Sequence, residues 1–332
     1  MQANHGLISK HDLATYAAKV RTPVRGTYRG YEIISMPPSS SGGIAIIETL
    51  NILENFDLKA LGRNSVATQH LLIEAMRRAF LDRARYLGDP DFVKVPVEKL
   101  IAKDYAKTLA QGIDRTHASS SVELGKDIVT PVASDRESEE TTHFSVVDKD
   151  GMAVSNTFTL EGGFGSHVVV SGAGYLLNNE MGDFNKKPGE TNTNGDIGTE
   201  PNLIAPGKRM LSSMSPAIVT KGGQLFMVTG SPGGRTIINT VFETILNATE
   251  FGMNVRDAVD TPRMDHEWLP DRVTFERNAV PDSVVKRLEA MGHTVRVGGG
   301  QGDAHSIIYD AKTKTAYGAN DLRSSDSKVG KP

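Results

Sequence analysis

The chain has 332 residues, of which 38% are hydrophobic and 23% are charged, a composition typical of a globular protein with a sizeable core. Its formal net charge of -3 at pH 7 gives no reason to expect nucleic acid or an anionic membrane as a partner. Cysteine is absent, which excludes disulfides, thiolate nucleophiles and thiolate metal sites.

The sequence contains no recognisable metal motif and no membrane span. Its nine histidines are scattered, and none has the HExxH spacing of a zinc site. We interpret the nearest cluster, MDHEW at 264–268, as structural, so the histidine pattern predicts no metal site. No apolar stretch reaches the length of a membrane span. The N-terminus lacks the basic start and apolar core of a signal peptide, so the compartment stays open.

The first part of the chain predicts mostly helices. A short helix is expected near Asp12, and the alternating residues 28–37 predict one strand that ends at Pro37. Serines and glycines at 37–43 precede apolar residues with helical spacing at 44–56. They therefore lie at a helix N-terminus, where backbone N–H groups are free.

A second, longer helix is predicted over 65–87. It is amphipathic, with acidic residues early and arginines late, as the helix dipole favours. Residues 103–140 begin with helical character and then become polar, which makes this stretch the best linker candidate in the chain.

From Thr141 onward the pattern changes to strands and turns. Hairpins are predicted at 142–160, 215–230 and 305–321, and helices at 231–251 and 281–292. Residues 178–202 form a long loop rich in asparagine and glycine, and loops of that length are usually functional. Helices followed by paired strands with helices between them indicate an α+β fold, built in layers.

The junction between linker and strand carries the most specific chemistry. Thr141 follows the run Glu-Ser-Glu-Glu and begins the first hairpin. Threonine is common at strand starts, so a structural role is one interpretation. If the Glu140–Thr141 bond were cut, however, Thr141 would carry a free α-amino group with a pKa of about 7.7–8.0, which can act as a general base toward its own hydroxyl. This is the N-terminal form of an activated nucleophile.

An acyl-transfer site also needs donors for the developing oxyanion. Gly233 and Gly234 lie where a strand turns into a helix, so backbone N–H groups converge there. A plain tight turn is the alternative. A phosphate-binding loop is not favoured, because the GxxxxGK[ST] pattern is not met and no lysine follows the glycines.

Seven segments in order resemble the gamma-glutamyltranspeptidase family over the whole chain: MPPSSSGGIAIIETLNILENFDL, YLGDPDFVKVP, TTHFSVVDKDG, LLNNEMGDF, LSSMSPAIV, VTGSPGG and PRMDHEWLP. The resemblance implies an N-terminal-nucleophile hydrolase with a four-layer αββα sandwich, whose precursor cuts itself before a threonine. Residues 1–140 would be the C-terminal part of the large subunit, and 141–332 the small subunit. Glu140 and Thr141 would form the processing site.

The resemblance also implies roles for individual residues. Thr159 matches a threonine that hydrogen-bonds the nucleophile. Glu180 and Asp183 match acidic residues that hold the α-ammonium of the substrate, although a solvated loop is the alternative for both. Ser212 and Ser213 match a pair that binds the α-carboxylate. Gly233 and Gly234 match the oxyanion hole. The implied reaction passes a γ-glutamyl group from an amide such as glutathione, through a Thr141 ester, to water or an amine, without a cofactor.

Three features depart from the family pattern. Glu161 stands where many members have asparagine, and its carboxylate could still meet the ammonium. Asn194 occupies the position of a tyrosine that covers the pocket in several bacterial members, which suggests a more open site. By the resemblance, the chain would also start partway through the large subunit, and the portion before it would include an arginine that pairs with the substrate α-carboxylate. A large-subunit segment could then be supplied in trans, and loss of such a contact would weaken binding.

Three hypotheses follow from the sequence. The first is a self-processing γ-glutamyl transferase and hydrolase. The second is an acylase of the same family that acts on a β-lactam side chain or on poly-γ-glutamate. The third is an unprocessed, inactive fragment that only binds a ligand or partner. Family members are typically periplasmic or secreted, but no signal peptide is recognised in this sequence, so the localisation is left open.

Overall fold

The computed structural model describes residues 1, 6–130 and 141–330. The stretch predicted as one strand from Tyr28 to Pro37 is instead a hairpin of β1 (Val24–Tyr28) and β2 (Tyr31–Ser35). The turn between the strands uses Arg29 and Gly30, with φ of 48° and 82°, the left-handed pair of a type I′ turn. The single-strand prediction was wrong because an arginine gives no local signal for this conformation.

Six strands form one antiparallel sheet in the order β1-β2-β5-β6-β10-β11. The predicted hairpins are confirmed as β5 (Ala217–Lys221) with β6 (Gln224–Thr229), and β10 (Ser306–Asp310) with β11 (Thr315–Ala319). Strand β2 pairs with β5 along its whole length, so segments on both sides of residues 131–140 share the sheet. The first part of the chain, predicted as mostly helices, thus also contributes two strands to the sheet, and a mixed α+β fold is observed.

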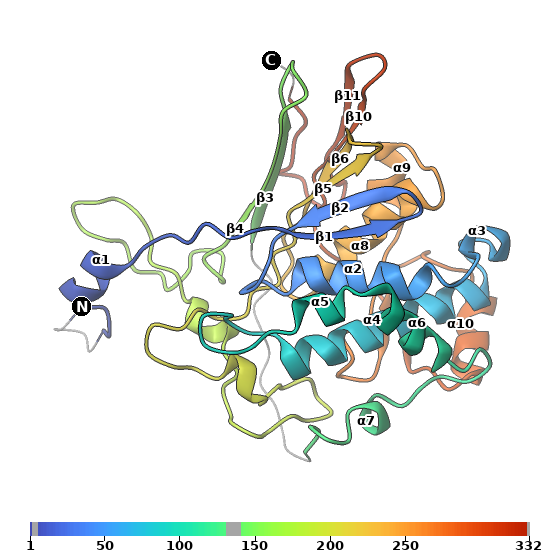
Figure 1. The fold of residues 1–332 in the computed structure, drawn as a ribbon, viewed down its shortest axis with the longest axis horizontal. Coiled ribbons are helices and arrows are strands. Elements are labelled where there is room, and N and C mark those ends of the chain that lie inside the picture. The colour runs from blue at the N-terminus through green and yellow to red at the C-terminus, as the bar shows by residue number, and fades with distance from the viewer. Residues whose placement is uncertain (2–5, 131–140, 331–332) are drawn as a thin grey trace.

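Helices pack on this sheet in two tiers (Figure 1). Helix α2 (Gly42–Leu53) contacts β1 and β2, α8 (Thr236–Thr249) contacts β6, and α4 (Val66–Tyr86) packs against α2. Every residue of α2 is buried. Helix α4 was predicted to be amphipathic, but most of it is buried, and its buried Glu74 pairs with Arg77 and Arg78 of the same helix. The remaining helices are α1 (Lys10–Thr15), α3 (Leu58–Leu61), α5 (Val97–Leu100), α6 (Lys103–Gln111), α7 (Ser121–Leu124), α9 (Val255–Asp260) and α10 (Asp282–Ala290).

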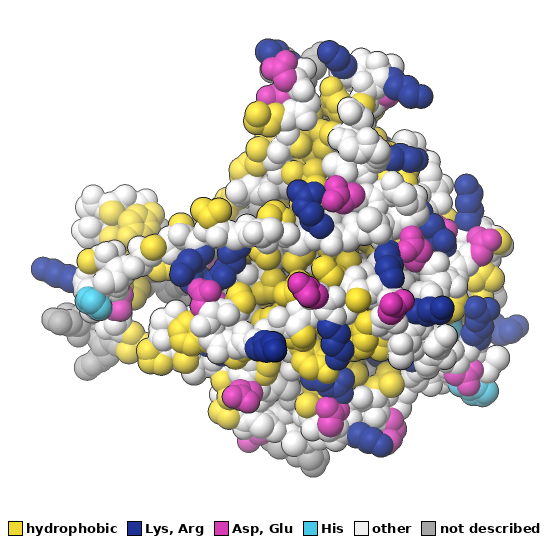
Figure 2. Space-filling view, viewed as in Figure 1, with side chains coloured by type: hydrophobic (Ala, Val, Ile, Leu, Met, Phe, Trp, Pro, Cys, Tyr) yellow, Lys and Arg dark blue, Asp and Glu magenta, His cyan; other side chains and the backbone are white. Residues whose placement is uncertain are grey.

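A separate hairpin carries the predicted nucleophile. Strands β3 (Thr142–Val147) and β4 (Ala153–Phe158) pair with each other and pack against β5, β6 and β10. His143 on the inner face is buried, whereas Phe144, Val146, Val154 and Phe158 are exposed. Figure 2 shows hydrophobic side chains gathered in the upper half of the view, where Figure 1 places the strands. A further small sheet joins β7 (Met264–Asp265), β8 (Val273–Phe275) and β9 (Val295–Val297). Two 3-10 turns, Glu180–Asp183 and Glu200–Asn202, lie in the long loop.

Candidate active site

The register of the β3–β4 hairpin brings two threonine hydroxyls together. Thr142 pairs with Phe158, so Thr141 and Thr159 lie side by side at the open end of the hairpin. The Oγ of Thr141 donates to the Oγ of Thr159 at 3.4 Å. Thr159 Oγ also accepts the backbone N–H of Glu161 at 2.8 Å. The hydroxyl of Thr141 therefore has an oriented partner that is itself fixed by the backbone.

Acidic side chains surround this pair. Glu161 adopts a left-handed conformation, with φ of 71°, and its carboxylate lies where a side chain on Gly182 would be. Glu180, in the 3-10 turn, is 9% exposed, and its Oε1 has no hydrogen-bond partner among the described residues. Burial and then the charge of Glu161 raise the pKa of Glu180, against a smaller opposing effect of the Thr159 hydroxyl. The alternative of a solvated loop is therefore wrong for Glu180, and the arrangement can accept a cationic group.

The serine pair is held by the Ser-Ser-Ser segment that precedes α2. Ser41 N donates to Ser212 O at 2.8 Å, and Ser212 N donates to Ser39 O at 3.0 Å. Arg83 of α4 donates to Ser213 Oγ at 3.1 Å and to Ser41 Oγ at 3.0 Å. Arg83, the Ser41 hydroxyl and the N-terminus of α2 thus lie next to Ser212 and Ser213. Together they provide a suitable environment for a carboxylate.

The two glycines form the turn before α8. Gly233 has φ of 129° and Gly234 has φ of 56°, and a side chain on Gly233 would lie 2.7 Å from Thr236 Oγ. Their carbonyl groups accept the first hydrogen bonds of the helix, from Thr236 N at 3.1 Å and Ile237 N at 3.2 Å. Among the described residues, no acceptor takes a hydrogen bond from the amide of Gly233 or Gly234. Both amides can therefore donate to a ligand.

These elements meet around one hollow. It is lined by Thr141, Thr159, Glu161, Asp183, Ser212, Ser213, Met214, Gly234, Arg235 and Ile237. Glu180 and Gly233 adjoin the hollow, and Glu140 lies outside the described residues. The exposed Asn194 is absent from this lining. Sequence reasoning therefore named most of the lining.

Two arginines of the site were missed by sequence reasoning. Arg235 Nε pairs with Glu267 at 3.0 Å, and together with Asp183 it also lines a neighbouring hollow that includes Arg83 and the loop residues 184–187. For Arg235, its position directly after the glycine pair was an available signal. For Arg83, which lies on the buried side of a helix, the sequence contained no such signal.

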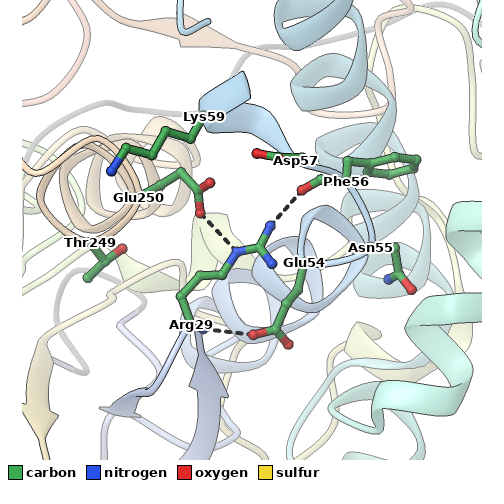
Figure 3. Close-up of a pocket in the computed structure, with 8 residues that line it drawn as sticks. All are labelled: Arg29, Glu54, Asn55, Phe56, Asp57, Lys59, Thr249 and Glu250. Carbon is green, nitrogen blue, oxygen red and sulfur yellow. Dashed lines mark hydrogen bonds and ion pairs between the residues drawn. The ribbon is translucent and has the colours of Figure 1, made fainter. Parts of the chain in front are cut away.

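A separate pocket lies at the turn between β1 and β2 (Figure 3). Arg29 lines it: its guanidinium pairs with Glu250 at 3.1 Å and donates to Phe56 O at 2.6 Å, while its backbone N–H donates to Glu54 at 2.7 Å. The C-termini of α2 and α8 converge there and favour a cation. Arg29 supplies that cation. Through its contacts with Phe56 and Glu250, it also connects segments on both sides of residues 131–140. Its lining residues are Arg29, Glu54, Asn55, Phe56, Asp57, Lys59, Thr249 and Glu250.

One buried cluster among the described residues has metal-ligand chemistry, namely His70, Glu74 and His293. The two imidazoles hydrogen-bond each other at 2.7 Å. Both arginines that pair with Glu74 lie beside them, so local positive charge competes with a metal ion. The MDHEW histidine, His266, is buried and contacts the Trp268 backbone N–H and Asp271. These contacts suit a structural role.

Residues 1–330 match the family model described as gamma-glutamyltranspeptidase. The chain belongs to this family. A glutathione hydrolase proenzyme of Escherichia coli (strain K12) is 49% identical over 326 residues, which are 98% of this chain and 55% of that protein. This gamma-glutamyltranspeptidase family member thus spans about half the length of that curated relative.

Solved structures agree with the family assignment. A cephalosporin acylase from Bacillus halodurans superposes with a TM-score of 0.80 at 28% identity, covering 97% of this chain and 55% of that one. A T380A mutant of gamma-glutamyltranspeptidase from Helicobacter pylori gives 0.52 at 44% identity, covering 55% of this family member and 100% of that chain. Within the part of the chain that is described, no helix has both the length and the apolar character needed to cross a bilayer.

Proposed function

We propose that this chain carries the catalytic machinery of a self-processing γ-glutamyl transferase and hydrolase, with Thr141 as its nucleophile. The observation that carries the proposal is the single hollow in which the Thr141 hydroxyl, the carboxylates, the serine pair and a glycine amide meet. They come from segments far apart in sequence. Family membership and the glutathione hydrolase relative support the choice of reaction.

The proposal divides the chain into two pieces that stay together. Residues 1–140 are the C-terminal part of a large subunit and 141–332 are the small subunit, within a four-layer αββα sandwich of the N-terminal-nucleophile type. The Helicobacter pylori chain covers 55% of this chain with its full length, close to the share that residues 141–332 would make up. The pairing of β2 with β5 would hold the pieces together after cleavage.

Processing comes first in the proposed sequence. The Oγ of Thr141 attacks the carbonyl carbon of Glu140, the peptide C–N bond breaks, and the hydroxyl proton moves to the Thr141 nitrogen. Water then hydrolyses the resulting ester, which leaves a carboxylate on Glu140 and a free amine on Thr141. That amine takes the proton of its own hydroxyl in each later turnover.

Turnover uses the same nucleophile on a γ-glutamyl amide. As Oγ attacks the γ-carbonyl carbon, the amides of Gly233 and Gly234 donate to the developing oxyanion. The amide C–N bond breaks and the leaving amine takes the proton from the Thr141 amine. A γ-glutamyl ester remains, and water or an amino acid or peptide amine attacks it and releases Thr141 Oγ.

Recognition of the glutamyl group follows from the charges around the hollow. Glu161, Glu180 and Asp183 would hold the α-ammonium, and Ser212 and Ser213 the α-carboxylate. The buried Glu180 Oε1, which has no hydrogen-bond partner among the described residues, supports this assignment, because a buried acceptor of this kind costs free energy until a donor arrives.

An acylase acting on a larger amide is the second candidate. The cephalosporin acylase match over 97% of this chain favours it. So does the exposed Asn194, at the position that the resemblance assigns to a tyrosine covering the pocket in several bacterial members. A wider entrance would admit a bulkier acyl or leaving group.

Intact mass of the purified, denatured protein tests the proposal first. Two species divided before Thr141 are expected for the parent chain, and one uncut species for Thr141→Ala. The parent should release p-nitroaniline from γ-glutamyl-p-nitroanilide, whereas the variant should not. An uncut parent without turnover would contradict the proposal, and turnover of a cephalosporin amide alone would favour the acylase.

A further inference from the structure

A histidine outside the hollow connects the strand of the nucleophile to the glycine loop. His305 directly precedes β10, and its Nδ1 lies 2.6 Å from the carbonyl oxygen of His143. His143 is two residues after Thr141 on β3. Because a carbonyl oxygen only accepts, Nδ1 carries the proton, and Nε2 faces Asp303 Oδ1 at 3.2 Å.

The same short segment also holds the glycine loop. The backbone N–H of His305 donates to Gly230 O at 3.0 Å, and the N–H of Asp303 donates to the buried Ser231 Oγ at 2.8 Å. Gly302, directly before Asp303, has φ of 63°, and a side chain there would lie 2.7 Å from Ser231 Oγ. The segment can therefore approach the loop only with glycine at this position.

The side chain of His143 fills the space between the same two elements. Its ring hydrogen-bonds Thr157 Oγ at 2.8 Å and Ser145 Oγ at 3.0 Å, and it occupies the place where a side chain on Gly230 would be. Ser145 Oγ in turn donates to His305 O at 2.8 Å. Strand β3, the glycine loop and the start of β10 thus form one packed unit.

We propose that Asp303 and His305 are positioning residues that hold the Thr141 strand in register with the glycine loop, so that nucleophile and oxyanion donors keep the distance that attack requires. The inference rests on the proposed function and deepens it. Neither side chain lines the hollow, so their effect would pass through the His143 carbonyl and Ser231.

The charge of His305 is set by the groups that face it. Burial disfavours the imidazolium, but Asp303, the His143 carbonyl and Asp321 outweigh burial and raise the pKa of His305. The ring of His143, 6.2 Å away between centroids, is neutral because burial and then the charge of His305 lower its pKa to about 3. As pH rises through the raised pKa, His305 loses its Nε2 proton and its ion pair with Asp303, so kcat is expected to decline with rising pH.

The test compares three substitutions of the full chain with the parent. His305→Leu removes the donor, His305→Asn places an amide N–H near the position of Nδ1 but does not titrate, and Asp303→Asn removes the counter-charge. His117→Asn, in an exposed surface turn, is the matched control. Self-cleavage is followed by intact mass, γ-glutamyl-p-nitroanilide kinetics are measured from pH 6 to pH 10, and thermal melts check folding.

His305→Leu should lose about 10- to 100-fold in kcat, as a small misplacement of reacting groups does, with little change in KM. His305→Asn should recover most of kcat and lack the decline with rising pH, while Asp303→Asn should move that decline to lower pH. If folded His305→Leu keeps the kcat and the pH profile of the parent, this inference is overturned while the proposed function is not. If that variant does not fold, unchanged profiles in Asp303→Asn and His305→Asn would overturn it. A parent chain that neither cleaves itself nor turns over would overturn the proposed function, and this inference with it.

Discussion

Replacing Glu180 with glutamine is expected to weaken substrate binding while leaving the fold at least as stable. The substitution keeps the size and one acceptor oxygen of a side chain that is 9% exposed. Burial and the neighbouring Glu161 raise the pKa of Glu180, so the charged form is disfavoured until a cation binds. Glutamine removes that buried charge and the attraction for the α-ammonium together.

The magnitude follows from the loss of one charge-assisted contact. A hydrogen bond to a charged group contributes about 1.5–3 kcal/mol, and about 1.4 kcal/mol is tenfold in affinity, so KM should rise about 10- to 150-fold. The value of kcat should change less, because the ammonium is not the reacting centre. Since the folded pKa of Glu180 is raised, its effect on stability turns unfavourable as pH rises through that pKa, and the variant should lack this dependence.

Paired substrates isolate the contact. Initial rates are measured with γ-glutamyl-p-nitroanilide and with glutaryl-p-nitroanilide, which lacks only the α-amino group. The parent should discriminate strongly between them, and Glu180→Gln should discriminate much less. Glu289→Gln, on an exposed position of α10, controls for the loss of one negative charge.

Two results would refute this reasoning. Equal fold losses on both substrates would show that Glu180 does not meet the ammonium. A clear fall in the thermal midpoint of Glu180→Gln would show that the carboxylate stabilises the fold, contrary to its raised pKa.

Three further results are expected. Thr159→Val removes the hydroxyl beside Thr141 and should slow both self-cleavage and kcat with little change in KM; normal cleavage by intact mass would contradict this role. Phe242→Ala, on α8 and 1% exposed, should lower the free energy of unfolding by about 3–5 kcal/mol in urea titrations, and a much smaller loss would mean that the site repacks. Stability should fall as pH drops from 6.5 toward 3. The reason is that burial, with nearby positive groups, lowers the pKa of both His143 and His293 to about 3, so the unfolded chain binds their protons first. A flat profile in denaturant titrations across that range would contradict the neutral, buried state of both rings.

Local patterns predicted most elements because their causes lie within a few residues. The apolar spacing of α2 and α4 and the Gly222–Gly223 turn between β5 and β6 needed no distant partner. The β1–β2 turn was missed because the left-handed conformation of Arg29 depends on its contacts with Glu54, Phe56 and Glu250, which no local pattern contains.

The sequence by itself determined the family, the position of Thr141 at the start of a strand, and the residues able to surround it, because motifs preserve residue types in order. Tertiary structure alone decided the pairing of β2 with β5, the burial of Glu180, and the contacts of Arg83 and His305. The physical reason is that the β2–β5 pairing and the contacts of Arg83 with Ser213 and of His305 with His143 join segments more than a hundred residues apart. The burial of Glu180 likewise depends on how the chain folds around its 3-10 turn. Spacing along a chain does not encode which distant surface will exclude water from a given side chain.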